Sequence, residues 1–150
     1  MDLILWRHAE AEMGIPDLDR RLTAKGVKQA ARMAQWLDAR LPDSCRILVS
    51  PAERTQQTVQ ALQRKYRTLP ELAPGASAAT VLAAANWPDS REPVLVVGHQ
   101  PTLGFVVSLL LSGQEAYWSI RKGAVWWLSH RAREETGAVV VKAALAPEFV

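Results

Sequence analysis

The sequence predicts an α/β fold, a three-layer α/β/α sandwich whose central sheet is mostly parallel and has an antiparallel edge at its C-terminal end. Short β-forming runs alternate with segments of helical periodicity along most of the 150 residues, which is typical of a sheet covered on both faces. Residues 94–97 are four consecutive β-formers, the pattern of a fully buried strand. The last β-forming runs, 124–128 and 138–142, flank the polar loop 130–137, so we expect an antiparallel hairpin. No repeat or linker interrupts the chain, and we expect residues 1–150 to form a single domain.

The first elements are expected to be a strand at residues 3–6, a helix at 24–40 and a second strand at 47–49. Thr23 can cap the N-terminus of the helix, and Pro42 ends it. Apolar side chains recur at helical spacing and mark its inner face: Val27, Ala30, Ala34, Leu37 and Leu41.

A capping box marks the start of the next helix. The Ser50 hydroxyl can accept a hydrogen bond from the backbone N–H of Glu53, and the Glu53 carboxylate can reach back to the N–H of Ser50. Pro51 occupies the first helical position, where its missing N–H is tolerated. We therefore expect the following order: helix 51–66, loop 70–75, helix 77–86, strand 94–97 and an apolar helix that ends before Gly113.

The composition is that of a globular protein, with 49% hydrophobic and 22% charged residues. No apolar run approaches the roughly 18 residues of a membrane span, and the N-terminus lacks a secretory leader pattern. The single cysteine, Cys45, has no internal disulfide partner, which indicates a cytoplasmic protein. The net charge of +3 comes mainly from arginine, which supplies 13 of the 18 cations. Such a charge fits either a solvated basic surface or an anionic ligand, because arginine binds phosphate with two donors.

Polar residues follow three of the predicted strands at one edge of the sheet. Arg7 and His8 follow the first strand, Arg54 lies just beyond the second, and His99 follows strand 94–97. Ligands bind at the carboxyl ends of the strands in sheets of this kind. Two of the three histidines therefore lie on one predicted rim, together with two arginines and the N-terminus of a helix.

This combination of residues predicts phosphoryl chemistry. A neutral imidazole such as that of His8 can attack phosphorus through a ring nitrogen. Arg7 and Arg54 can stabilise the charge on the phosphoryl oxygens, and His99, as a cation, can donate to the same oxygens. The third histidine, His130, lies in the predicted hairpin loop, where we expect it to be solvated.

Four motifs along the chain resemble those of a known family. They are RHAEA at 7–11, RRLTAKG at 20–26, SPAERTQQT at 50–58 and GHQP at 98–101. In order and spacing they resemble the signatures of the histidine phosphatase superfamily, which has a phosphoglycerate mutase-like fold. The short chain and the RHAEA start are most similar to the SixA-type phosphohistidine phosphatases.

The resemblance implies a catalytic role for each matching residue. His8 would be the nucleophile and form a phosphohistidine intermediate that water hydrolyses, with no cofactor and no metal. Arg7, Arg54 and His99 would bind the phosphoryl group, and Arg20 is a lesser candidate at the rim of the pocket. The implied substrate is a phosphohistidine-bearing protein, for example a histidine phosphotransfer domain, which indicates a role in signal transduction.

One departure from larger relatives bears on the substrate. Many of them carry a general acid in a longer insertion, whereas the corresponding region here, 70–77, contains Glu71 as its only acid. An alkoxide leaving group needs protonation, and an imidazole leaving group needs less help. A missing acid therefore fits a phosphohistidine substrate, with Glu71 either a weak general acid or an ordinary loop carboxylate.

Three alternatives remain open from the sequence. A small-molecule or broad-specificity phosphomonoesterase of the same superfamily would carry the same motifs. His8, Glu10 and Glu12 alternate along an extended segment and could bind a metal ion. A nucleic-acid-binding module would need clustered cations and stacked aromatic residues, but the six tryptophans are scattered, and Trp126 and Trp127 point to opposite faces of one strand. We therefore expect neither a nucleic acid nor a membrane as partner.

Overall fold

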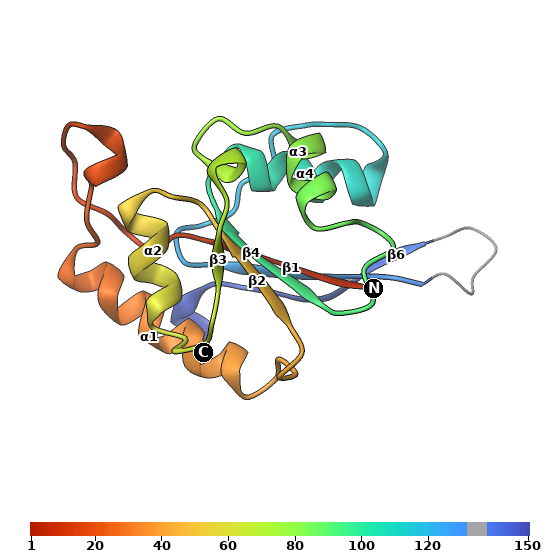
Figure 1. Cartoon of the computed structure of the whole chain (residues 1–150), viewed down its shortest axis with the longest axis horizontal. Helices are drawn as coiled ribbons and strands as arrows, with labels where there is room; N and C mark the ends of the chain where they lie inside the picture. The colour runs from red at the N-terminus through yellow and green to blue at the C-terminus, as the bar shows by residue number, and fades with distance from the viewer. Residues whose placement is uncertain (132–137) are drawn as a thin grey trace.

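The computed structural model describes residues 1–131 and 138–150, so most of the predicted hairpin loop lies outside the described residues. Six strands form one sheet in the order β3-β2-β4-β1-β5-β6 (Figure 1). The strands are β1 (Asp2–Arg7), β2 (Arg46–Val49), β3 (Arg67–Thr68), β4 (Val94–Gly98), β5 (Val125–His130) and β6 (Val139–Leu145). The helices are α1 (Ala24–Asp38), α2 (Glu53–Gln60), α3 (Ala78–Ala84) and α4 (Thr102–Ser112), with short 3-10 turns η1 (Asp17–Asp19), η2 (Pro70–Leu72) and η3 (Pro147–Phe149).

The sheet is mixed, as the sequence predicts. Strands β3, β2, β4 and β1 are parallel to one another, whereas β5 pairs antiparallel with β1 and with β6. Helices α1 and α2 cover one face of the sheet and α3 and α4 cover the other (Figure 1). The predicted three-layer α/β/α sandwich with an antiparallel C-terminal edge is therefore confirmed.

The central strands β1 and β4 are buried on both faces. In β1, Leu3 and Leu5 pack in the core beneath α3 and α4, whereas Ile4 and Trp6 pack in the core beneath α1 and α2. All four side chains are fully buried. Because side chains alternate along a strand, a strand between two helical layers needs an unbroken apolar run, and this is the pattern that residues 94–97 show.

Three local predictions are wrong. Helix α2 ends at Gln60 rather than near residue 66, because the chain turns at Gln63, whose φ of 55° is left-handed and does not continue a helix. Val27 is 54% exposed and does not belong to the inner face of α1, although the other four residues of the predicted stripe are buried. His130 ends strand β5 and is half-buried rather than solvated, with its ring edge-on to Trp87 at 5.6 Å between centroids.

The tryptophan pair of β5 points to opposite faces of the sheet, as predicted. Trp127 packs edge-on against Trp36, and Trp126 packs against Trp118, each at 6.2 Å between ring centroids. Both rings are thus engaged in packing, and they do not form an exposed stacking platform. Within residues 1–131 and 138–150, none of the helices has the length and apolar character needed to cross a membrane.

Candidate active site

Two histidines lie side by side at the carboxyl edge of the sheet, where the sequence predicts the site. His8 follows β1 and His99 follows β4, and these strands are parallel neighbours with Arg7 opposite Gly98. The two ring centroids are 5.4 Å apart. Both residues are buried, with His8 7% and His99 3% exposed.

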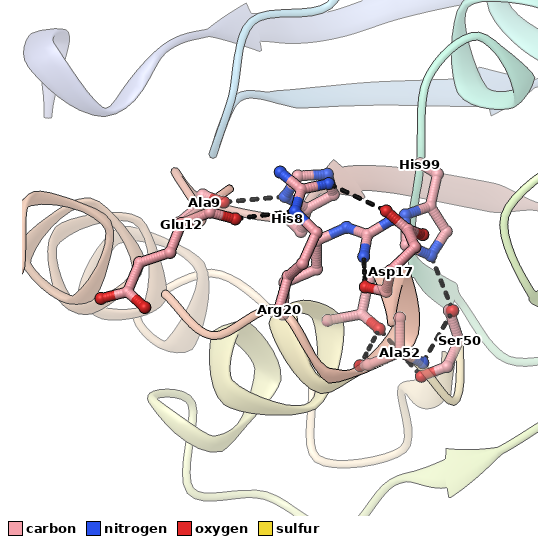
Figure 2. A network of polar contacts seen from close by, with 10 residues as sticks. His8, Ala9, Glu12, Asp17, Arg20, Ser50, Ala52 and His99 are labelled. Atoms are coloured by element: carbon pink, nitrogen blue, oxygen red, sulfur yellow. Dashed lines mark hydrogen bonds and ion pairs between the residues drawn. The ribbon is translucent and has the colours of Figure 1, made fainter. Parts of the chain in front are cut away.

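The His8 ring is fixed by a hydrogen bond to the backbone. Its Nδ1 atom lies 2.7 Å from the carbonyl oxygen of Ala9 (Figure 2). A carbonyl oxygen only accepts, so Nδ1 carries the proton and the neutral ring keeps a lone pair on Nε2. The environment also holds His8 neutral: burial, followed by the charges of Arg54, Arg7 and Arg20, lowers its pKa to about 4.

The surroundings of His99 also favour a neutral ring. Burial, followed by the neighbouring His8 and Arg54, lowers its pKa to about 3. The lowered pKa does not favour the predicted cationic His99, because the side chain is buried and lies close to Arg54 and Arg7. Its Nε2 atom lies 2.7 Å from the Ser50 hydroxyl, which leaves Nδ1 as the nitrogen available for other contacts.

The Ser50 hydroxyl contacts His99 and does not form the predicted capping box with Glu53. It accepts a hydrogen bond from the N–H of Ala52 at 3.2 Å, and it contacts His99 (Figure 2). The N–H of Ser50 donates to the Val97 carbonyl as an extension of the sheet, so it is not free for the Glu53 carboxylate. Helix α2 accordingly begins at Glu53 with Ala52 as its N-cap and no side-chain cap.

Arg54 is buried in the first turn of α2, with its side chain 5% exposed. Its Nη1 donates to the backbone carbonyl of Asp17 at 2.8 Å, and its Nη2 lies 3.1 Å from the Asp17 carboxylate. The same carboxylate accepts from Arg20 at 3.1 Å, and Arg20 is further held by the Glu12 carbonyl (Figure 2). Asp17 therefore joins Arg54 to Arg20, and hydrogen bonds first from Arg20 and then from Arg54 lower its pKa.

Asp17 is a site residue that the sequence does not indicate. It lies in the loop between the first two motifs, among exposed residues, and no spacing rule connects it to a strand end. The one available signal was its place three residues before Arg20, a spacing that allows an ion pair within one turn.

Three buried nitrogen atoms of the site have no hydrogen-bond partner within the described residues. They are the Nε atoms of Arg7 and Arg54 and the Nδ1 atom of His99. Buried polar atoms are nearly always paired, so each case calls for a partner. The oxygens of a phosphoryl group accept hydrogen bonds and would suit all three residues that the sequence assigns to phosphate.

Residues of the second motif, 20–26, hold the loop after β1 that carries His8. The Thr23 hydroxyl caps α1 by accepting from the N–H of Gly26, and it donates to the Glu10 carboxylate at 2.8 Å. A Cβ on Gly26 would lie 2.0 Å from the Glu10 carbonyl oxygen, so only glycine allows α1 to approach this loop. On the other side, the Ala9 N–H donates to the Thr58 hydroxyl, which joins the loop to α2.

Glu71 lies apart from this group of residues. It is exposed in η2 and lines a groove of about 400 Å³ together with Arg46, Arg67 and Thr80, and none of the two histidines or three arginines of the site lines that groove. The carboxylate that contacts the site is that of Asp17. Within the described part of the chain, no three His, Cys, Asp or Glu side chains form a group that could hold a metal ion, so the alternative built on His8, Glu10 and Glu12 gains no support.

The mixed sheet and the two histidines that follow β1 and β4 are the arrangement expected of the histidine phosphatase superfamily. The model of the histidine phosphatase superfamily (branch 1) matches residues 3–76, and the chain belongs to this superfamily. Among its relatives, the phosphohistidine phosphatase SixA of Escherichia coli (strain K12) is 32% identical over 125 residues, which cover 76% of each chain.

Solved structures show the same fold. The protein histidine phosphatase SixA in complex with tungstate superposes with a TM-score of 0.77 at 26% identity and covers 99% of both chains. A mutant phosphoserine phosphatase from Entamoeba histolytica in complex with phosphoserine superposes with a TM-score of 0.74 at 16% identity, over 99% of this chain and 98% of that one. The second likeness concerns the fold alone.

Proposed function

We propose that this chain is a phosphohistidine phosphatase that removes the phosphoryl group from phosphohistidine on a protein, with His8 as the nucleophile. The observation that carries the proposal is the state of the His8 ring. Its Nδ1–H is bound to the Ala9 carbonyl, and its pKa is lowered to about 4, so Nε2 offers a lone pair at neutral pH.

The proposed reaction has two steps. In the first, Nε2 of His8 bonds to phosphorus, and the bond between phosphorus and the substrate imidazole breaks. The substrate ring, protonated at its other nitrogen, leaves with the electron pair as a neutral imidazole. In the second step, a water oxygen bonds to phosphorus, and the electron pair of the Nε2–phosphorus bond returns to His8. Inorganic phosphate leaves, and a proton of the water passes to solvent.

Arg7, Arg54 and His99 bind the phosphoryl oxygens in this proposal. Their unpaired buried nitrogens supply donors, and His99 donates through Nδ1 in the tautomer whose Nε2 accepts from Ser50. Fixed donors and cations of this kind stabilise the charge that builds up on the oxygens in the transition state. Arg20 contributes at the rim through its contact with Asp17.

The choice of phosphohistidine rests on two points. The relative that is 32% identical is named a phosphohistidine phosphatase. Glu71, the one acid of the short loop, lies outside the group around His8, and an imidazole leaving group needs little help from an acid. A small-molecule or broad-specificity phosphomonoesterase is the second candidate, because the residues around His8 could also receive a phosphoryl group from a phosphoester.

The decisive experiment is the His8→Ala variant, assayed for hydrolysis of a histidine-phosphorylated protein. We expect complete loss of activity and no radiolabelled enzyme intermediate. His130→Ala is the matched control, because His130 lies at the end of β5 and should leave activity intact. Surviving activity in His8→Ala would contradict the nucleophile assignment. Faster turnover of sugar phosphates than of the phosphoprotein would favour the second candidate.

We further propose that residues 1–150 act as one histidine phosphatase domain in the cytoplasm, without a metal, in phosphotransfer signalling. Vanadate, which resembles pentacoordinate phosphorus, should inhibit the enzyme, and EDTA should not. Loss of activity in EDTA that zinc or magnesium restores would refute the metal-free mechanism. The lone Cys45, whose pKa burial raises to about 11, is an unreactive thiol that suits a reducing compartment.

A further inference from the structure

A basic groove of about 560 Å³ lies beside the phosphoryl site and reaches Arg7. We infer that it binds an acidic segment of the protein that carries the phosphohistidine. The inference rests on the proposed function and names the feature of the partner that the enzyme recognises. The cations that line the groove are Arg7, Lys25, Lys28, Arg32, Arg121 and Lys122.

The groove has a large excess of positive charge. Its two acids are Glu10 and Glu148. Glu10 is engaged by the Thr23 hydroxyl, and Glu148 pairs with Arg121 at 2.6 Å. Lys25, Lys28 and Lys122 are exposed, and none of them has a carboxylate within ion-pair distance among the described residues. Three ammonium groups are thus available to an acidic partner.

The groove is continuous with the proposed phosphoryl site. The Nη1 atom of Arg7 donates to the Ile120 carbonyl at 2.7 Å, and the next two residues, Arg121 and Lys122, line the groove. A partner whose phosphoryl group contacts Arg7 would therefore pass over these side chains.

The length of the groove favours an extended partner over a small phosphate. Lys25, Lys28 and Arg32 lie on one face of α1, and seven residues of helix rise about 10 Å. A single phosphoryl group contacts one or two cations and leaves the rest unused. An extended segment rises about 3.3 Å per residue, so roughly three acidic residues beside the phosphohistidine would match this row.

Two labelled peptides test the inference. Both carry a hydrolysis-resistant phosphoryltriazole in place of phosphohistidine, one with Asp and Glu flanks and the other with Asn and Gln flanks. Fluorescence anisotropy measures their Kd. For the wild-type protein we expect the acidic peptide to bind at least about tenfold more tightly at low salt, with the difference shrinking as salt shortens the Debye length.

The triple variant Lys25→Glu, Lys28→Glu, Lys122→Glu should weaken the acidic peptide about tenfold or more and change the neutral peptide less than about twofold. The matched control carries the same change of charge at the opposite edge of the sheet, where β2 and β3 begin. It replaces the exposed cations Arg46, Lys65 and Arg67 with glutamate and should leave both Kd values near those of the wild type.

Equal binding of the two peptides by the wild-type protein would overturn the inference, as would a control variant that weakens the acidic peptide as much as the groove variant. Tighter binding of a single-stranded RNA or of phosphatidylserine vesicles, lost in the groove variant, would assign the groove to a different polyanion. Hydrolysis is measured separately on phosphohistidine peptides. If hydrolysis fails while the binding pattern holds, the proposed function is wrong and the groove assignment stands.

Discussion

Lowering the pH from about 7.5 to about 5 should destabilise the fold through His8 and His99. Both side chains are buried and neutral, with pKa values lowered from 6.5 to about 4 and about 3, mainly by burial. In the unfolded chain each ring titrates near its ordinary pKa. Below pH 6.5 the unfolded state therefore binds protons that the folded state does not bind. The free energy of unfolding falls as the pH falls.

The size of the effect follows from these pKa values. Each histidine costs about 1.4 kcal/mol per pH unit once the unfolded ring is fully protonated and the folded ring is not. Between pH 7.5 and pH 5 this amounts to about 2 kcal/mol for each ring, and on the order of 4 kcal/mol for both. That is a large part of the 5–15 kcal/mol stability typical of a domain. Asp17, whose pKa is lowered, adds to the loss at lower pH.

Urea denaturation followed by tryptophan fluorescence at several pH values measures this slope. The His8→Ala variant is the internal comparison, because it removes one of the two titrating rings and should remove about half of the pH dependence, whatever its stability at pH 7.5. A wild-type stability that stays flat between pH 7.5 and pH 5 would refute the view that the pair is held neutral. An unchanged slope in His8→Ala would show that the protons bind elsewhere.

Three further substitutions test the packing and the charge of the site. Arg54→Lys keeps the charge but loses the planar fork beside Asp17, and steady-state kinetics should show kcat/KM lowered about a hundredfold; a change below about threefold would contradict the role of the fork. Ser50→Ala leaves the buried Nε2 of His99 unpaired, and urea titration should show about 1–3 kcal/mol lower stability; no loss would mean that another group replaces the hydroxyl. Gly26→Ala forces a Cβ against the carbonyl oxygen of Glu10, and thermal unfolding should show a cost of about 1–3 kcal/mol, whereas an unchanged Tm would mean that α1 shifts freely.

The order of layers could be predicted from the sequence because the signals are local. Strand β4 is an unbroken apolar run, as expected of a strand covered by helices on both faces. Helix α1 has the predicted Thr23 cap and most of the predicted buried apolar side chains. The position of the site could also be predicted. The parallel strands β1, β2 and β4 end at the same edge of the sheet, so His8, Ser50 and His99 lie together there.

The errors at the site have a common cause: local neighbours compete with partners that are distant in the sequence. Ser50 has the neighbours of a capping box, but its N–H belongs to the sheet and its hydroxyl to His99. The charge state of His99 was also beyond a sequence pattern, because its lowered pKa depends on burial and on His8, Arg54 and Arg7, which the fold gathers nearby. Asp17 was missed for the same reason: its partner Arg54 is 37 residues away.

The charges of the site fit the proposed substrate. Arg7, Arg20 and Arg54 supply three guanidinium groups, and the Asp17 carboxylate cancels one of them. Because His8 and His99 are neutral, two positive charges remain, which match the charge of roughly −2 on a phosphoryl group at neutral pH. If both histidines were protonated, the proposed nucleophile would have no lone pair and the site would carry four positive charges. In the proposed reaction, the low pKa of the histidine pair would therefore have two effects: it keeps a lone pair on Nε2 of His8, and it keeps the net charge near that of the group to be transferred.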